Sequence, residues 1–582
     1  MRPLSDTTHK ALLPLGSTTI LGRLIDALQQ ARVQQVLVVT GYRAAEVREF
    51  LEGRHEANLD LCFVHNERFA TTNNVVSLAL ALDQISPDKD VLLIECDLVF
   101  DPTLISALVE HAGGNVALVD RYRDGMDGTV VAVENGIVTE LFPPSAQSEG
   151  FSYRDKFKTL NLYRFEIGFC RDILGPAVAR YAADIDPSAY YELALGTLVD
   201  LPGQRITAEV VAGARWAEVD DPNDLNAVRF LFEPAERGAI LDRAHGGHWN
   251  YDLLDFAHMR NAHFPTPAML AAMAHALPAL LASYGSAQTL LDEKLSWLLG
   301  CDAARIVALH GATQALPILA RQFEHCTTAL PVPTFGEYAR LFAAARSYID
   351  RPGFDLDELD EIAATVELFV VVNPNNPTGT LLPAGALREL VARHPSTTFI
   401  VDESFHIFSG EQSMLEQLET EPLDNVVVLA SLSKSLGVPG LRLGYLYCSD
   451  RRLRARFAAE LPIWNLGAAA EHFLELALKY GPELERSIEQ TREDRSRLAE
   501  ALGALNLVAC VHPSAANFLL ITLADGAPSA VAVREALLRG EPVINVRDVS
   551  DRFADGQARL RIAVRTEQEN CVLLDALGKL AA

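Results

Sequence analysis

The sequence predicts a protein of two α/β units, and three observations lead to this. The chain has 582 residues, whereas a single hydrophobic core stops growing at about 250–300 residues. Short apolar runs alternate with amphipathic stretches, as in sheets covered by helices. Hydrophobic residues make up 49% of the chain and charged residues 22%, which is typical of well-buried domains. We expect the first unit at residues 1–235 and the second at 240–582.

The first unit contains three apolar runs that predict strands. They are VQQVLVVTGY (33–42), DVLLIECDLVF (90–100) and NVALVD (115–120). Amphipathic segments such as TILGRLIDALQQA lie between them, and this alternation predicts a mostly parallel sheet covered by helices. The helical stretch LFEPAERGAILDRA is expected to connect the two units.

The second unit repeats this α/β order. It begins near His245 with helix-rich sequence, and runs that predict strands follow. These are RIVALHG (305–311), ELFVVVNP (367–374), TFIVDES (398–404) and NVVVLASLSK (425–434).

Composition excludes several classes of protein. The formal net charge of −27 argues against binding of nucleic acid, which requires clustered Lys and Arg. The eight cysteines show no C-x-x-C spacing, so neither a zinc site nor a disulfide framework is indicated, and a reducing cytoplasm is expected. No apolar run reaches the roughly 18 residues of a membrane span. We expect a cytoplasmic enzyme that does not enter a membrane.

Acidic residues in the first unit predict a metal site. Asp97 ends an apolar strand, where open α/β sheets bind ligands, although this position also suits an aspartate that caps the next helix. Downstream, WAEVDDPNDL places Glu218 and Asp220 on one face of an extended segment and Asp224 at a helix start. Mg²⁺ takes one or two carboxylates together with phosphate oxygens. Asp97 and Asp220 are therefore expected to bind the metal of a nucleotidyl transfer.

These motifs, together with MRPLSDTTHKALLPLG and NERFATTNNVVSLALA, resemble the sugar-phosphate and phosphocholine nucleotidyltransferase family. The element Thr72–Leu78 is more similar to the phosphocholine and phosphonate cytidylyltransferases than to the sugar enzymes. The resemblance implies a Rossmann-like nucleotide-binding fold with CTP as substrate. It also implies that Lys10 is catalytic and that Asp97 and Asp220 are the Mg²⁺ ligands.

The start of the chain departs from this family. Its members begin with a strand and a loop similar to L-A-A-G-x-G-x-R, whose backbone N–H groups bind the triphosphate, and the sequence lacks both. We expect that Met1 is an internal methionine and that roughly 15 upstream residues carry the Gly-rich loop. The alternatives are a first unit that no longer transfers nucleotides and one that only binds or senses them.

SLSKSLGVPGLRLGYL (431–446) is the most informative stretch of the chain. A lysine after a Ser-x-Ser turn can form a Schiff base with a carbonyl cofactor while the hydroxyls bind a phosphate, and Arg442 adds charge there. VDESF supplies Asp402 at a strand end, where it can pair with a protonated pyridine nitrogen. NPNNPTG adds Asn376, and the turn HGATQ (310–314) offers free N–H groups to a phosphate.

These residues resemble the fold-type I pyridoxal-phosphate enzymes, the class I/II aminotransferases, across residues 240–582. The resemblance implies that Lys434 binds pyridoxal phosphate covalently, that Asp402 pairs with the pyridine nitrogen and that Asn376 contacts O3′. It also implies a homodimer. The remaining implied contacts are Phe335 for the ring face, Arg561 for the substrate α-carboxylate, and, for the phosphate, Thr313, Ser431, Ser433 and Arg442.

Within this class the sequence leans towards decarboxylation. The HGG at 245–247, the PGLRLGYL run and Phe405, where many aminotransferases have Tyr, resemble the threonine-phosphate decarboxylases, which are close to histidinol-phosphate aminotransferases. A missing Tyr hydroxyl changes the cofactor's electronics without forbidding either reaction. Transamination therefore stays open as the alternative.

The pairing of the two units resembles the bifunctional enzymes of fosmidomycin-type phosphonate antibiotic pathways. That resemblance implies transfer of CMP from CTP to the phosphonate of 2-amino-4-phosphonobutyrate, followed by pyridoxal-phosphate-dependent decarboxylation of the adduct. The alternative is a 2-aminoethylphosphonate or phosphocholine-type cytidylyltransferase fused to an aminotransferase.

Overall fold

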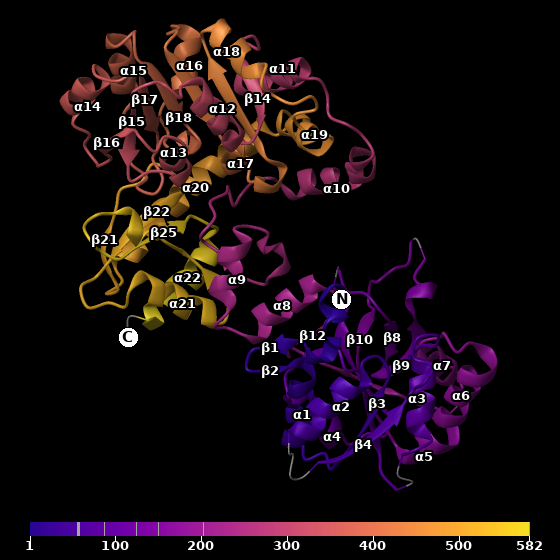
Figure 1. Cartoon of the computed structure of the whole chain (residues 1–582). Helices are drawn as coiled ribbons and strands as arrows, with labels where there is room; N and C mark the ends of the chain where they lie inside the picture. The colour runs from indigo at the N-terminus through magenta and orange to yellow at the C-terminus, as the bar shows by residue number, and fades with distance from the viewer. Residues whose placement is uncertain (55–58, 86–87, 124, 149, 202, 581–582) are drawn as a thin grey trace. The chain divides into compact units, whose positions relative to one another are not determined.

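The computed structural model describes residues 1–54, 59–85, 88–123, 125–148, 150–201 and 203–580. They form two compact units, Met1–Tyr251 and Asp252–Ala582 (Figure 1). The stretch that was expected to connect the units contains helix α9 (Arg237–Ala244), which belongs to the first of them.

The first unit contains a six-stranded sheet in the order β5-β10-β7-β11-β9-β8. Its strands are β5 (Val91–Ile94), β7 (Val116–Arg121), β8 (Val130–Glu134), β9 (Ile137–Phe142), β10 (Phe157–Phe165) and β11 (Thr207–Val210). Strands β7 and β11 pair in parallel, whereas β10 runs antiparallel to β5, β7 and β8. Strand β9 also runs antiparallel to its partners β8 and β11. The prediction of a mostly parallel sheet is therefore wrong for the first unit.

A hairpin accounts for one of these antiparallel pairs. Strands β8 and β9 are joined by Asn135 and Gly136, both at positive φ, which is the sequence and geometry of a type I′ turn. Strands joined in this way are antiparallel, unlike those joined by helical crossovers. A separate parallel pair, β3 (Gln35–Thr40) and β4 (Asp60–His65), follows the expected pattern.

Helices cover both faces of this sheet. Along β7, Val116 and Leu118 pack in a core with α1 (Ile20–Gln30) and α4 (Thr103–Glu110). The alternate residues, Ala117 and Val119, pack with α3 (Asn74–Leu82) and α7 (Tyr191–Val199). Strands buried on both faces account for the continuous apolar runs in the sequence.

The second unit has a seven-stranded sheet in the order β14-β20-β19-β18-β17-β15-β16. Its strands are β14 (Ile306–His310), β15 (Thr328–Val332), β16 (Arg346–Ile349), β17 (Leu368–Val372), β18 (Thr398–Asp402), β19 (Val426–Ala430) and β20 (Leu443–Cys448). Strands β15 to β19 pair in parallel, and β20 runs antiparallel between β19 and β14. The expected mostly parallel sheet is confirmed here.

Both faces of the seven-stranded sheet are also covered. Phe369 and Val401 pack with helices α14 (Leu356–Ala363) and α15 (Ala384–Arg393), which lie beside β17 in Figure 1. The alternate residues Val370 and Ile400 pack against α12 (Ala315–Gln322) on the other side.

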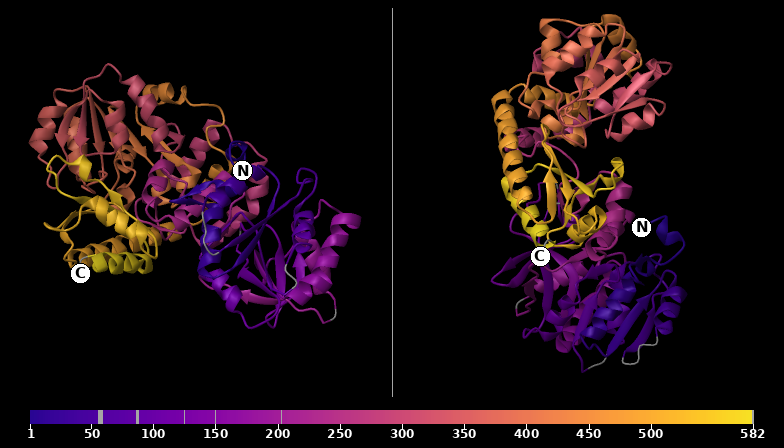
Figure 2. Two further views of the ribbon diagram at one scale, coloured as in Figure 1. Left: turned by 60° about the horizontal axis from the view of Figure 1, so that its bottom comes forward. Right: turned by 90° about the vertical axis from the view of Figure 1, so that its left-hand side faces the viewer.

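A smaller sheet follows, in the order β21-β22-β25-β24. Its strands are β21 (Val508–Val511), β22 (Phe518–Leu523), β24 (Arg547–Asp548) and β25 (Arg559–Ala563), and its helices are α21 (Ala530–Arg539) and α22 (Glu567–Leu580). The long helix α20 (Gly481–Gly503) runs beside this sheet in Figure 2, because Leu498 and Leu502 pack against Leu519 and Ile521.

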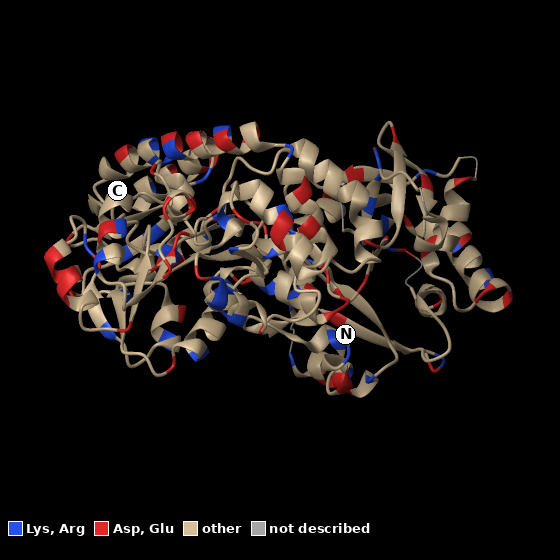
Figure 3. Cartoon of the chain, turned by 90° about the horizontal axis from the view of Figure 1, so that it is seen from above, with Lys and Arg blue, Asp and Glu red and all other residues tan. Residues whose placement is uncertain are grey.

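Acidic and basic residues are interspersed along the ribbon of both units (Figure 3). Within the described ranges, no helix combines the length and apolar character needed to cross a bilayer.

Candidate active sites

Two predicted carboxylates of the first unit lie side by side. Asp97 stands between β5 and β6 (Leu98–Phe100), and Asp220 follows β12 (Trp216–Glu218). Strands β6 and β12 pair antiparallel with Leu98 opposite Glu218, and the Val219 N–H donates to the Asp97 carbonyl at 3.0 Å. The short ladder therefore joins two segments that are 120 residues apart in the sequence.

Lys10 lies between these carboxylates. Its Nζ forms an ion pair with Asp97 and another with Asp220 Oδ1 at 3.4 Å. Burial lowers the pKa of Lys10, but the charge and hydrogen bond of Asp97 outweigh this and raise the pKa above its ordinary value. The lysine stays protonated, as binding of a phosphate requires.

The site also fits a divalent cation. Asp97 Oδ1 is buried and has no hydrogen-bond partner among the described residues, and Asp220 lies exposed beside it. One or two carboxylates with open positions for phosphate oxygens and water are the set that Mg²⁺ prefers. Asp97 and Asp220 would hold the ion.

A helix cap fixes the direction of Asp220. The N-cap of α8 (Pro222–Phe232) is Asp221, and Asp224 completes a capping box with it. The Asp224 carboxylate also accepts the Asp220 N–H at 2.9 Å. Asp224 therefore serves the helix start, as its position suggested, and leaves the Asp220 side chain available.

The sequence analysis missed a polar cluster next to this pair. Asn161 Nδ2 donates to Glu95 Oε2 at 3.3 Å and to Glu218 Oε1 at 2.9 Å. The buried Lys158 Nζ lies 3.0 Å from Glu218 Oε1. Burial, followed by the charges of Asp97 and Glu192, raises the pKa of Glu95 to about 8. The signal in the sequence was the Glu-x-Asp spacing, which occurs at both Asp97 and Asp220.

In the second unit, Lys434 and Asp402 end neighbouring strands. Asp402 is the last residue of β18, and Lys434 lies in the one-turn helix α17 (Leu432–Ser435) after β19. Burial and the charges of Arg561 and Arg442 lower the pKa of Lys434 to about 8, against the opposing charge of Asp402. A lysine with this pKa is partly neutral near pH 8, which suits attack on a carbonyl.

Asp402 has a partner that sequence reasoning missed. The fully buried Tyr338 donates its hydroxyl proton to Asp402 Oδ2 at 2.8 Å, and the Ser404 N–H donates to Oδ1 at 3.0 Å. Burial raises the pKa of Asp402, and these donors oppose that rise. Tyr338 lies three residues after Phe335 in the PTFGEY segment, and this proximity was the only signal.

The predicted phosphate residues are only partly brought together. Arg442 Nη2 lies 3.2 Å from Thr313 Oγ1, and a Cβ on Gly311 would lie 2.6 Å from the same guanidinium. This glycine, at φ +76°, lets the Arg442 guanidinium lie against the turn that precedes α12. Ser433 differs, because it is fully buried and its hydroxyl points to the Leu443 carbonyl at 3.4 Å. The Ser431 N–H donates to Ser404 Oγ at 3.0 Å.

Arg561 and Asn376 are in direct contact. Arg561 Nη1 donates to Asn376 Oδ1 at 2.5 Å, and Nη2 donates to the Ala257 carbonyl at 2.7 Å. Burial and the charges of Arg552 and Arg547 lower the pKa of Arg561 to about 9. Phe335 is half-buried. Its ring is edge-on to that of Tyr338, with 6.4 Å between the ring centroids. A buried lysine, a buried carboxylate at the end of the neighbouring strand and the contact between Arg442 and Thr313 together fit pyridoxal phosphate.

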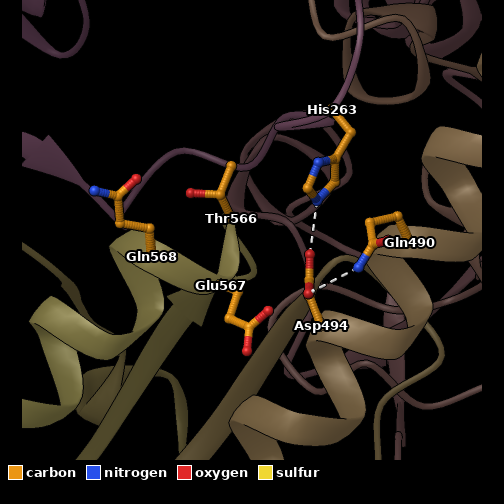
Figure 4. A pocket seen from close by; sticks show the side chains of 6 residues that line it. All are labelled: His263, Gln490, Asp494, Thr566, Glu567 and Gln568. Carbon is orange, nitrogen blue, oxygen red and sulfur yellow. Dashed lines mark hydrogen bonds and ion pairs between the residues drawn. The ribbon is translucent and has the colours of Figure 1, made fainter.

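A pocket of about 540 Å³ in the second unit contains none of these residues. Its His263 and Gln490 both point to Asp494, whose oxygens lie 2.6 Å from His263 Nε2 and 3.2 Å from Gln490 Nε2 (Figure 4). Asp494 has no exposed side-chain surface. These bonds hold the segment before α10 (Pro267–Leu281) against α20, so a structural role accounts for them.

Two family models match the chain. A MobA-like NTP transferase domain matches residues 4–183, and the aminotransferase class I and II family matches residues 253–577. The chain is also similar to CMP-5′-(3-aminopropyl)phosphonate synthase of Streptomyces rubellomurinus, at 31% identity over 99% of this chain and 92% of that protein.

Other relatives match about half of the chain. L-serine phosphate decarboxylase of Sulfurospirillum multivorans is 29% identical over 52% of this chain and 80% of that protein. Histidinol-phosphate aminotransferase of Thermococcus gammatolerans is 30% identical over 50% of this chain and 80% of its own length.

Solved structures agree on the fold of the second unit. L-threonine-O-3-phosphate decarboxylase of Porphyromonas gingivalis superimposes with a TM-score of 0.51 at 23% identity, over 56% of this chain and 99% of that one. A decarboxylase of Sulfurospirillum multivorans superimposes with a TM-score of 0.50 at 28% identity, over 56% of this chain and 95% of that one. The chain therefore belongs, through its second unit, to the pyridoxal-phosphate-dependent aminotransferase class I and II family, and it carries a MobA-like NTP transferase domain in its first.

Proposed function

We propose that the chain transfers CMP from CTP to an amino-acid phosphonate and then decarboxylates the adduct, within phosphonate antibiotic biosynthesis in the cytoplasm. The full-length similarity to CMP-5′-(3-aminopropyl)phosphonate synthase supports this. The observation that carries it is the presence of two separate constellations in one chain. These are Lys10 with two carboxylates, and Lys434 with the buried Asp402 and Tyr338.

In the first reaction, a phosphonate oxygen attacks the α-phosphorus of CTP, the bond to the β-phosphate breaks, and pyrophosphate leaves. Mg²⁺ supplies neutralisation of the triphosphate charge. Asp97 and Asp220 would hold the ion, and the protonated Lys10 would place a positive charge at the same phosphates. Catalysis of this kind depends on positioning and charge rather than on a covalent step.

In the second reaction, the bond from Cα to the carboxylate breaks, CO₂ leaves, and Cα takes up a proton. Pyridoxal phosphate supplies the electron sink for the released pair. Asp402, held by Tyr338, would keep the pyridine nitrogen protonated. Arg561 would hold the carboxylate beside Asn376, and Lys434 Nζ would carry the proton to Cα because its pKa of about 8 permits both states.

An aminotransferase in the second unit is the alternative. The 30% identity to histidinol-phosphate aminotransferase favours it, since the two reactions use the same residues and differ in which bond to Cα breaks. In that case the amino group would pass to a 2-oxo acid and the carboxylate would remain.

We also propose a homodimer. Helix α10 buries only Met269 within the chain, and Leu281 and Tyr284 are each 78% exposed. Tyr284 stacks on Trp464 at 4.4 Å, and Ile463 beside it is 77% exposed. An exposed apolar patch of this kind suits a contact with a second copy. Sedimentation should give twice the chain mass, and a monomer would count against the dimer.

One experiment tests the proposed function as a whole. The full chain is incubated with CTP, Mg²⁺, pyridoxal phosphate and 2-amino-4-phosphonobutyrate, and products are followed by mass spectrometry with assays of pyrophosphate and CO₂. A CMP adduct that then loses CO₂ is expected. An adduct that exchanges its amino group with a 2-oxo acid would make the second unit an aminotransferase. No adduct with any phosphonate or phosphocholine-like acceptor would remove nucleotidyl transfer from the first unit.

A further inference from the structure

The polar cluster beside Asp97 and Asp220 has more acceptors than donors. Glu95 and Glu218 each precede one of these aspartates by two residues. Asn161 bridges them, with Nδ2 at 3.3 Å from Glu95 and 2.9 Å from Glu218. Asn161 stands at φ +55°, where the pairing of β10 with β7 shifts its register. The backbone leaves the regular ladder at the residue that joins the two glutamates.

The cation of the cluster is already engaged. Lys158 is 2% exposed, and its Nζ lies 3.0 Å from Glu218 Oε1 and donates to the Thr159 carbonyl at 2.9 Å. A Cβ on Gly128 would lie 2.9 Å from the same nitrogen. Lys158 is therefore paired with Glu218. Its contacts with the Thr159 carbonyl and with Gly128 leave its Nζ little freedom to reach a further carboxyl group.

A third carboxyl group lies close by. Glu192 opens α7 and is 6% exposed, and its Oε2 has no hydrogen-bond partner among the described residues. Its neighbour Tyr191 is tied to Glu95 through Asn74, which accepts the Tyr191 N–H at 2.9 Å and donates to Glu95 Oε1 at 3.3 Å. Helix α7 thus presents its first turn to the same cluster.

Two buried tyrosine side chains, Tyr163 and Tyr191, also belong to this cluster. Tyr163 and Tyr191 are each 2% exposed, and their rings meet edge to face at 6.2 Å. Neither hydroxyl has a hydrogen-bond partner within the described part of the chain. Buried polar atoms are nearly always paired, so several orphans in one place indicate a group that binds there.

We propose that this interior binds the ammonium group of the acceptor, which rests on the proposed nucleotidyl transfer to an amino phosphonate. An ammonium group offers three donors and no acceptor, and donors are what Glu192 Oε2 and the two phenolic oxygens lack. A second Mg²⁺ fits less well, because that ion keeps water and phosphate oxygens around it. Since Asp97 and Asp220 lie next to Glu95 and Glu218, a compact acceptor can present its phosphonate to the metal site while its amine enters this interior. The first unit thereby selects amino phosphonates.

The test compares two acceptors that differ only in the amine, 2-amino-4-phosphonobutyrate and 4-phosphonobutyrate. For Glu192→Gln, pyrophosphate release should show a KM for the amino acceptor raised about 10- to 100-fold, because one charged partner is removed. The KM values for CTP and for 4-phosphonobutyrate should stay as in the wild type. Glu140→Gln, at an exposed position of β9, is the control and should change nothing.

Calorimetric titration of both acceptors onto the wild type and Glu192→Gln separates the possible failures. Since Glu192 belongs to the first unit, the difference between the two proteins reports that unit alone. Preference for the amino acceptor that disappears in the variant supports the site even if no pyrophosphate is released, and the proposed function alone would then fail. Equal effects of the substitution on both acceptors, or a changed Mg²⁺ requirement, would overturn the ammonium site.

Discussion

Tyr338 donates its phenolic proton to Asp402 Oδ2 at 2.8 Å in a fully buried position. Tyr338→Phe should leave this carboxylate oxygen without its donor, at a cost of roughly 1–3 kcal/mol. The pKa of Asp402, already raised by burial, should rise further, because the Tyr338 hydrogen bond opposes that rise. The more basic carboxylate should stabilise the protonated pyridine nitrogen more strongly, so bound pyridoxal phosphate should keep this proton up to a higher pH, which a pH titration of its absorbance measures.

A matched control exists for this substitution. Tyr348 is also buried and donates to the Val370 carbonyl at 2.8 Å, so Tyr348→Phe removes a similar bond away from Asp402. The melting temperature of the Tyr348→Phe variant should fall, while its absorbance titration should stay as in the wild type. Identical titrations for both variants would show that Tyr338 is only structural.

Lys434 should set the pH dependence of cofactor uptake. Its pKa is lowered to about 8 by burial and the charges of Arg561 and Arg442, and only the neutral amine attacks the carbonyl. The rate of pyridoxal phosphate uptake by the apoprotein should therefore rise up to about pH 8 and level off above it. A lysine with the ordinary pKa of ~10.4 would give an uptake rate that keeps rising up to about that pH. Stopped-flow absorbance measures the profile, and Arg561→Met should move the plateau to higher pH.

Asp97→Asn and Asp220→Asn should each lower Mg²⁺-dependent pyrophosphate release by at least ~100-fold, because each removes a charged ligand. Decarboxylation of a synthetic CMP adduct should be unaffected, since the second unit is intact. Glu140→Gln again serves as the exposed control. Full pyrophosphate release by either aspartate variant would refute the assigned metal site.

Arg561→Lys keeps a positive charge but loses the planar fork that binds a carboxylate with two hydrogen bonds. The kcat/KM of decarboxylation should fall by about 10- to 100-fold, mainly through KM. Pyrophosphate release from CTP should be unchanged. Steady-state kinetics of both half-reactions make the comparison, and an unchanged KM for decarboxylation would exclude Arg561 from carboxylate binding.

The alternation of apolar runs and helices was enough to predict the fold class of both units. The alternation did not predict the strand directions in the sheet of the first unit, because a two-residue turn sets one of them. Asn135 and Gly136 specify a hairpin, and the hairpin makes β9 antiparallel to β8. Every pairing of the second unit's parallel strands, by contrast, comes from helical crossovers that the alternation reveals.

Candidate site residues were predictable where chemistry dictates a short motif. Lys434 follows a Ser-x-Ser turn, and Asp402 and Asp97 end apolar strands. Tyr338, Asn161 and Glu192 could not be predicted, because their roles arise only when distant elements meet. Asn161, for example, acts through Glu95 and Glu218, which lie 66 and 57 residues away.

The hydrogen bond between Arg561 and Asn376 has a thermodynamic consequence. Asn376 is the residue assigned to the cofactor's O3′, and its Oδ1 also sets the direction of the guanidinium assigned to the substrate carboxylate. A cofactor that binds Asn376 therefore also orders Arg561, and a substrate that binds Arg561 also orders Asn376. Linkage requires such coupling to be reciprocal, so bound cofactor should tighten the binding of amino-acid ligands by the same factor by which those ligands tighten the binding of the cofactor.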